Sequence, residues 1–128
     1  MTPALEEARR LLRLAMRDED TFELLLPLPT APLSAIGFHA QQAVEKSLKA
    51  ACALRGLEIR RTHDLAALAQ ALLDDGATLP MPPDDFRQLN PFAVQYRYDD
   101  ELQSSMTLEE LSMAMRRVMA WARQLALP

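Results

Sequence analysis

β-Branched side chains are scarce in this chain of 128 residues, in which valine and isoleucine together occur only five times. Leucine, alanine and methionine supply 50 of the 63 hydrophobic residues. Those three lose little conformational freedom in a helix, whereas valine and isoleucine suit the pleated surface of a sheet. The composition therefore disfavours a large β-sheet and favours an all-α fold. A chain of this length is expected to form one domain, residues 1–128.

Cysteine and histidine are sparse as well. Cys52 is the only thiol, so the chain cannot form an internal disulfide. One cysteine with two histidines does not amount to a dedicated zinc site. We therefore expect a reducing compartment, no metal-binding residues and no cofactor.

Positive charge is also limited. The net charge is −4, so the chain as a whole does not attract phosphate backbones or anionic membranes, and any contact with nucleic acid has to be local. The N-terminus lacks the apolar segment of a signal peptide. The 21 uncharged residues from Leu24 to Val44 include three prolines, which argues against a membrane span. We expect a cytoplasmic protein without a membrane partner.

Five segments combine a helix-capping residue with apolar residues at three- and four-residue spacing. The five predicted helices cover about 3–26, about 33–55, a segment capped by Thr62 or Asp64 and ending at Gly76, a segment that starts at Pro83 and restarts at Asn90, and a segment opened by a capping box of Thr107 and Glu110. Short connections between them predict an antiparallel, up-and-down helical bundle of four to five helices.

The same spacing predicts which side chains pack inside the bundle. On the third helix they include Leu73, and on the last helix they include Leu125. We interpret four aromatic residues and four methionines as packing residues in the same way: Phe38, Phe86, Phe92, Trp121, Met106, Met113, Met115 and Met119.

The second predicted helix is two-sided. At 100° per residue, His39, Gln42, Glu45, Lys46 and Lys49 fall within one arc of about 120°, and the opposite arc is apolar. A polar arc is usually just a solvated helix face. Lys46 and Lys49, however, are the only lysines of the chain. At a spacing of three residues their charges repel each other weakly, which favours an anionic partner.

Charge is distributed unevenly along the chain. Residues 39–63 contain five basic and two acidic side chains, whereas residues 64–101 contain two basic and eight acidic ones. Such asymmetry is consistent with a phosphate-binding patch beside an acidic, partner-facing surface, although a run of charge is more often simply soluble surface.

Three segments resemble one known family. They are FHAQQAVEKSLKA at 38–50, THDL at 62–65 and FAVQYRY at 92–98, and together they resemble the HEPN domain family (higher eukaryotes and prokaryotes nucleotide-binding). The resemblance implies a compact helical bundle that is usually a homodimer. It also implies a prokaryotic gene beside a minimal nucleotidyltransferase, the pair forming a toxin-antitoxin or nucleotide-handling module.

Many HEPN proteins are metal-independent ribonucleases with an arginine followed after four to six residues by a histidine. Neither histidine of this chain has that spacing, since His63 is separated from Arg55 by seven residues and from Arg60 by two. The resemblance therefore implies a binding role for Arg97, which stands between two tyrosines, and no catalytic residue is assigned. The predicted nucleotide- or phosphate-binding residues are His39, Gln42, Lys46, Lys49, His63 and Arg97.

Three functions stay open at this point. The first is a binding module for a nucleotide or RNA that acts with a separate nucleotidyltransferase. The second is a ribonuclease toxin in which Arg55 or Arg97 meets His63 across a dimer. The third is a structural adaptor whose polar arc is a protein-binding surface.

Overall fold

The computed structural model describes residues 1–59, 61–93 and 105–127. Over those residues the chain is helical and contains no strand, which confirms the predicted all-α bundle. The elements are α1 (Pro3–Leu25), α2 (Leu33–Leu54), α3 (Leu65–Asp74), α4 (Pro83–Arg87), the 3-10 helix η1 (Asn90–Ala93) and α5 (Leu108–Ala126).

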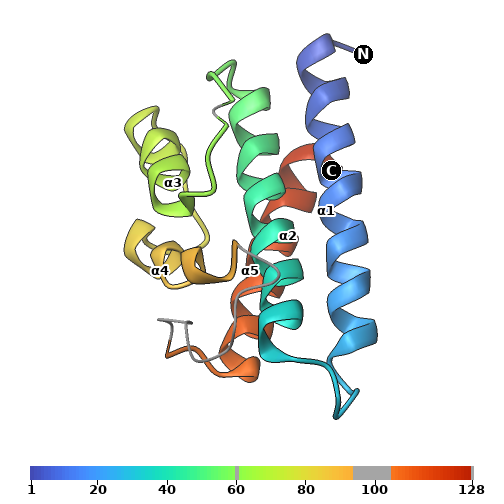
Figure 1. Ribbon diagram of the computed structural model, residues 1–128. Helices are drawn as coiled ribbons and strands as arrows, with labels where there is room; N and C mark the ends of the chain where they lie inside the picture. Colours follow the sequence, from blue (N-terminus) through green and yellow to red (C-terminus); the bar gives the residue numbers. More distant parts are fainter. Residues whose placement is uncertain (60, 94–104, 128) are drawn as a thin grey trace.

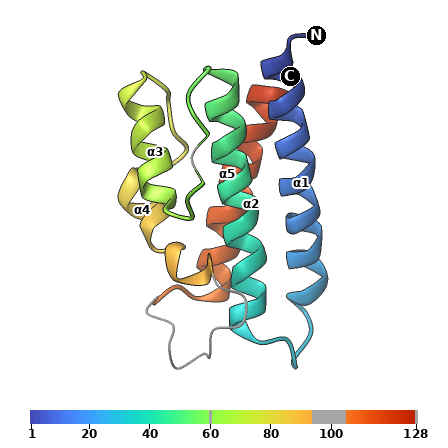
Figure 2. The same cartoon turned by 45° about the horizontal axis from the view of Figure 1, so that its top comes forward.

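The central element is α2. It runs antiparallel to α1, which lies along one side of it, while α3 and α4 lie on the other side and α5 packs behind it (Figure 1). The turned view in Figure 2 shows the same order of helices. Because α2 has neighbours on several sides, most of its surface is inside the bundle, and even its polar residues contact other helices.

The helix ends follow the predicted caps. The hydroxyl of Thr2 accepts a hydrogen bond from the backbone N–H of Leu5 at 3.1 Å, and Pro3 occupies the first turn. Gly56 takes a positive φ of 69° directly after α2. Thr107 and Glu110 form the predicted capping box of α5.

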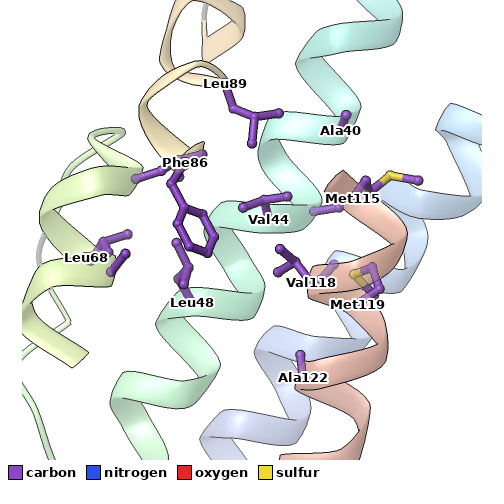
Figure 3. Packing of buried hydrophobic residues seen from close by; sticks show 14 of the residues in the cluster. Ala40, Val44, Leu48, Leu68, Phe86, Leu89, Met115, Val118, Met119 and Ala122 are labelled. Carbon is purple, nitrogen blue, oxygen red and sulfur yellow. The ribbon is translucent and has the colours of Figure 1, made fainter. Parts of the chain in front are cut away.

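The hydrophobic core lies where α2, α5 and the α3–α4 unit meet. Val44 and Leu48 of α2 point toward Val118 of α5 and toward Phe86 of α4 (Figure 3). All four side chains are fully buried. Burial of each such side chain stabilises the fold by about 1.5–3 kcal/mol, so this cluster is a large part of what holds the bundle together.

Some predicted packing residues lie elsewhere. Leu73 and Leu125 are 45% and 44% exposed, so those two predictions were wrong, and Ala126 is the residue that is buried at the end of α5. Phe86, Phe92, Met115 and Met119 are buried as predicted, whereas Met113 is exposed. Asn90 was predicted to cap its own segment, but its side-chain oxygen accepts a hydrogen bond from the N–H of Leu65 at the start of α3. No helix in the described part of the chain is long and apolar enough to span a bilayer.

Candidate phosphate-binding site

The first cluster of the site surrounds the carboxylate of Asp18. This residue is on α1, yet its side chain faces α2 and is largely buried. Nδ1 of His39 lies 3.0 Å from one carboxylate oxygen, and Nζ of Lys46 donates to the other. Because an ionised carboxylate only accepts, the His39 nitrogen that faces it carries the hydrogen. Asp18 therefore holds two of the predicted site residues in place.

The second cluster surrounds the carboxylate of Glu45, which is 4% exposed. Nε2 of Gln41 and Nδ1 of His63 lie 3.1 and 2.6 Å from one of its oxygens, and Nζ of Lys49 donates to the other at 3.1 Å. A buried carboxylate is costly unless it is paired and hydrogen-bonded. Three side chains contact the carboxylate of Glu45, so its charge is both paired and hydrogen-bonded.

The polar arc of α2 is thus not a solvated helix face. The amide of Gln41 is completely buried and accepts a hydrogen bond from Gln42 at 2.7 Å. The side chains of Lys46 and Lys49 are only 26% and 16% exposed. The alternative of a solvated helix face does not hold, because α1 packs along α2 beside the arc and His63 lies against Glu45.

The structure brings the predicted site residues together in pairs. His39 and Lys46 share Asp18, and Lys49 and His63 share Glu45. Gln42 joins the second pair through Gln41. Arg97 lies outside the described residues, so its distance from the two pairs is not defined.

Charge in the two clusters cancels. Asp18 and Glu45 offset Lys46 and Lys49, so with neutral histidines the formal sum is zero. Each ammonium still has three N–H donors and gives one to its carboxylate, which leaves two for another acceptor. The imidazole of His63 is 66% exposed while the Nδ1 side is held by Glu45. The arrangement can therefore donate several hydrogen bonds to an anion from positions that are already fixed.

Sequence reasoning missed Asp18 and Gln41 and treated Glu45 as a surface charge. A signal for Asp18 was present, because it stands three residues after Ala15 and four before Phe22 on the buried face of α1. A carboxylate on an apolar face needs a cationic partner. The identity of that partner on α2 depends on how the helices pack, which spacing alone does not give. The described residues contain no group of three or more side chains suited to hold a metal ion.

A comparison with protein families matches the HEPN domain over residues 8–125, which is nearly the whole chain. The chain belongs to the HEPN family. Neither the curated proteins nor the solved structures contain a match to it. Membership gives this HEPN domain a nucleotide- or RNA-related function.

The arginine–histidine spacing of many HEPN ribonucleases is absent from this sequence. Arg55, which is separated from His63 by seven residues, binds Asp75. Its Nε donates to Asp75 Oδ2 at 2.8 Å, and its Nη2 donates to the Asp75 carbonyl at 2.7 Å. Within the described residues, His63 shares the carboxylate of Glu45 with Lys49.

Proposed function

We propose that this HEPN domain binds a phosphate group of a nucleotide or of RNA on the polar side of α2. The binding residues are His39, Gln42, Lys46, Lys49 and His63, with Arg97 added from the 94–104 segment. The domain acts as a binding module and does not itself carry a catalytic residue. Family membership supports the nucleotide- or RNA-related part of this proposal.

The observation that carries the proposal is the fixed placement of both lysines. Lys46 and Lys49 are held by buried carboxylates, Asp18 and Glu45, and neither is wrapped around a surface acid. Holding the ammonium groups in advance lowers the entropy that is lost when a ligand binds. The two remaining N–H donors of each lysine then provide the contacts to phosphate oxygens.

The proposed partners follow from the same family. We propose that the protein is a cytoplasmic homodimer of prokaryotic origin and works with a separately encoded minimal nucleotidyltransferase, as a toxin-antitoxin or nucleotide-handling module. The excess of acidic side chains in the sequence between 64 and 101 favours a cationic partner. Co-purification with the product of the adjacent gene tests this part, and a stable complex supports it.

The binding proposal is tested by titrating the protein with ATP and with a short RNA at two salt concentrations. The double variant Lys46→Gln, Lys49→Gln, whose amides can still donate to Asp18 and Glu45, should bind neither ligand measurably, while circular dichroism should show an intact helical fold. Absence of saturable binding by the unmodified protein, or unchanged affinity in the double variant, contradicts the proposal.

A second variant, Asp18→Asn, separates a ligand role from a structural role. The amide keeps the shape of the carboxylate but releases Lys46 from its ion pair and removes one negative charge. If Lys46 binds phosphate from the position that Asp18 fixes, affinity should fall by about 2- to 13-fold, because the released ammonium then has to be ordered on binding at a cost of ~0.5–1.5 kcal/mol. If Lys46 only supports the fold, stability falls and affinity does not change.

One observation favours a second candidate, the ribonuclease. The carboxylate of Glu45 lies 2.6 Å from Nδ1 of the exposed His63 imidazole, an arrangement by which a buried carboxylate can orient a general base. Metal-independent cleavage of RNA that disappears in His63→Ala, and persists with a chelator, would support an enzyme in place of a binding module. Binding without cleavage supports the first proposal.

A further inference from the structure

A hollow of about 690 Å³ lies between the C-terminal ends of α2 and α5 and the residues that follow α3. Figures 1 and 2 both show these two helix ends at the same end of the bundle. Pockets that hold small molecules in proteins usually have a volume of about 300–1,000 Å³. The α2–α5 hollow is therefore large enough to hold a small molecule.

The α2–α5 hollow is separate from the polar arc of α2. Ala51 lines it from α2 and is 3% exposed. Ala51 follows Gln42, in the middle of the polar arc, by nine residues, which places the two about 180° apart around the helix. The hollow thus lies on the opposite side of α2 from Lys46 and Lys49, and a ligand there is independent of the proposed phosphate-binding residues.

One wall of the hollow is the indole of Trp121, on α5. Its Nε1 donates to the carbonyl of Thr78, and the ring packs against the hydrophobic core while part of it stays exposed. Because the hydrogen bond fixes the orientation of the indole, an aromatic ligand can pack against it with little further loss of side-chain freedom.

Much of the remaining lining is apolar. Leu54 and Ala77 pack against the core and are partly exposed, and Leu125 is 44% exposed. A ligand that covers this surface removes apolar area from water, which is favourable in proportion to the area covered. The hollow therefore favours a ligand with an apolar body.

The charged group of the lining is Arg55, and its charge is already offset. Nε and Nη2 of Arg55 donate to the carboxylate and to the backbone carbonyl of Asp75. A guanidinium has five N–H groups, so three remain for an acceptor in the hollow. Because Asp75 cancels the charge, an anion gains little attraction, and a cation would face the guanidinium itself. An uncharged acceptor, such as a carbonyl oxygen, suits this position best.

We propose that the α2–α5 hollow binds a small, uncharged molecule with a flat aromatic ring and a carbonyl group. The ring packs against Trp121, and the carbonyl oxygen accepts hydrogen bonds from Arg55. This binding site is additional to the proposed function and does not depend on it.

The probe for this site is benzamide, which has one aromatic ring and one uncharged carbonyl group. Binding is followed by the ¹⁵N–¹H resonance of the indole, a single signal because the chain has one tryptophan. Benzamide should shift this signal saturably, with a Kd of about 0.1–10 mM for a ligand of this size. Benzoate and benzylammonium have the same ring with a charge, and they should bind at least about fivefold more weakly because that charge loses water without an unpaired opposite charge to meet.

The variant Ala77→Phe places a ring in the hollow and should abolish the shift with benzamide. The matched control is Ala114→Phe, because Ala114 is also partly exposed and packs against the core but does not line the hollow. The control should bind benzamide as tightly as the unmodified protein does. Circular dichroism checks that both variants are folded.

A second pair of variants keeps the test decisive if the phenylalanine at position 77 disturbs the fold. Leu125→Gln removes apolar surface from the hollow and should weaken the binding of benzamide by about two- to fivefold. Leu108→Gln changes a similarly exposed leucine at the other end of α5 and should leave the affinity unchanged. The proposal is overturned by the absence of a saturable shift, by equal affinities within a pair of folded variants, or by tighter binding of either charged probe.

Discussion

The aromatic ring of Phe92 lies against the α-carbon of Gly37, in the space that a side chain at position 37 would occupy. A Cβ placed on Gly37 would meet three ring carbons at 2.2–2.7 Å. Phe92 is 1% exposed, so its ring has no open space into which to move. The contact fixes η1 against α2 two residues before His39, at the point where the chain continues toward Arg97.

Substitution of Gly37 by alanine should destabilise the fold by about 1–3 kcal/mol, because the added methyl group overpacks the core. Urea unfolding followed by circular dichroism measures the change. Alanine is a better helix former than glycine by ~1 kcal/mol, so an increase in stability would show that the ring does not press on this position.

The matched control removes the ring. Phe92→Ala alone should cost about 3–5 kcal/mol. In the double variant the methyl group at position 37 has space, so the combined loss should be smaller than the sum of the two single losses. Additive losses would contradict a direct contact between the two residues.

Replacement of Glu45 by alanine should cost about 3–5 kcal/mol, because it leaves the buried amide of Gln41 and the ammonium of Lys49 without their acceptor. Glu23→Ala provides the comparison. Glu23 binds Arg116 on the surface with both partners about half exposed, and its loss should cost less than ~1 kcal/mol. Similar losses in the two variants, measured by chemical unfolding, would show that burial of Glu45 does not matter.

Asn90 should stabilise the start of α3, to which its side chain is hydrogen-bonded. Its side chain accepts from the N–H of Leu65 and donates to Asp64 at 3.1 Å, so it completes the N-terminus of α3. Asn90→Ala should lower stability by about 1 kcal/mol, the usual value of a helix cap. Hydrogen exchange should quicken at the amide of Leu65 more than at Leu111, whose helix is capped by Thr107. Equal changes at both amides would contradict the assignment.

The helices could be predicted from the sequence because their signals are local. Thr2, Gly56 and Thr107 mark helix ends through contacts within a few residues, and each prediction is confirmed. Leu73 and Leu125 had the right spacing to be buried, but each lies near the end of its helix, where no neighbouring element covers it. The spacing of apolar residues predicts on which side of a helix a side chain lies. It does not predict whether another element packs against that side.

The site was predictable only in part, for the same reason. Lys46, Lys49 and His63 were predicted as binding residues, which stays a prediction, and the structure brings the last two together on Glu45. The carboxylate of Asp18 comes from a position 28 residues before Lys46. That contact depends on the register between two antiparallel helices, which cannot be predicted from a single sequence.

The one tryptophan of the chain joins two parts of the bundle. Nε1 of Trp121, on α5, donates to the carbonyl of Thr78 at 2.9 Å, in the connection between α3 and α4. Light emitted by a single indole reports only on its own surroundings. The intrinsic fluorescence of this protein therefore responds to separation of the α3–α4 unit from α5, and a fluorescence change that precedes the loss of helical signal would reveal that unit detaching first.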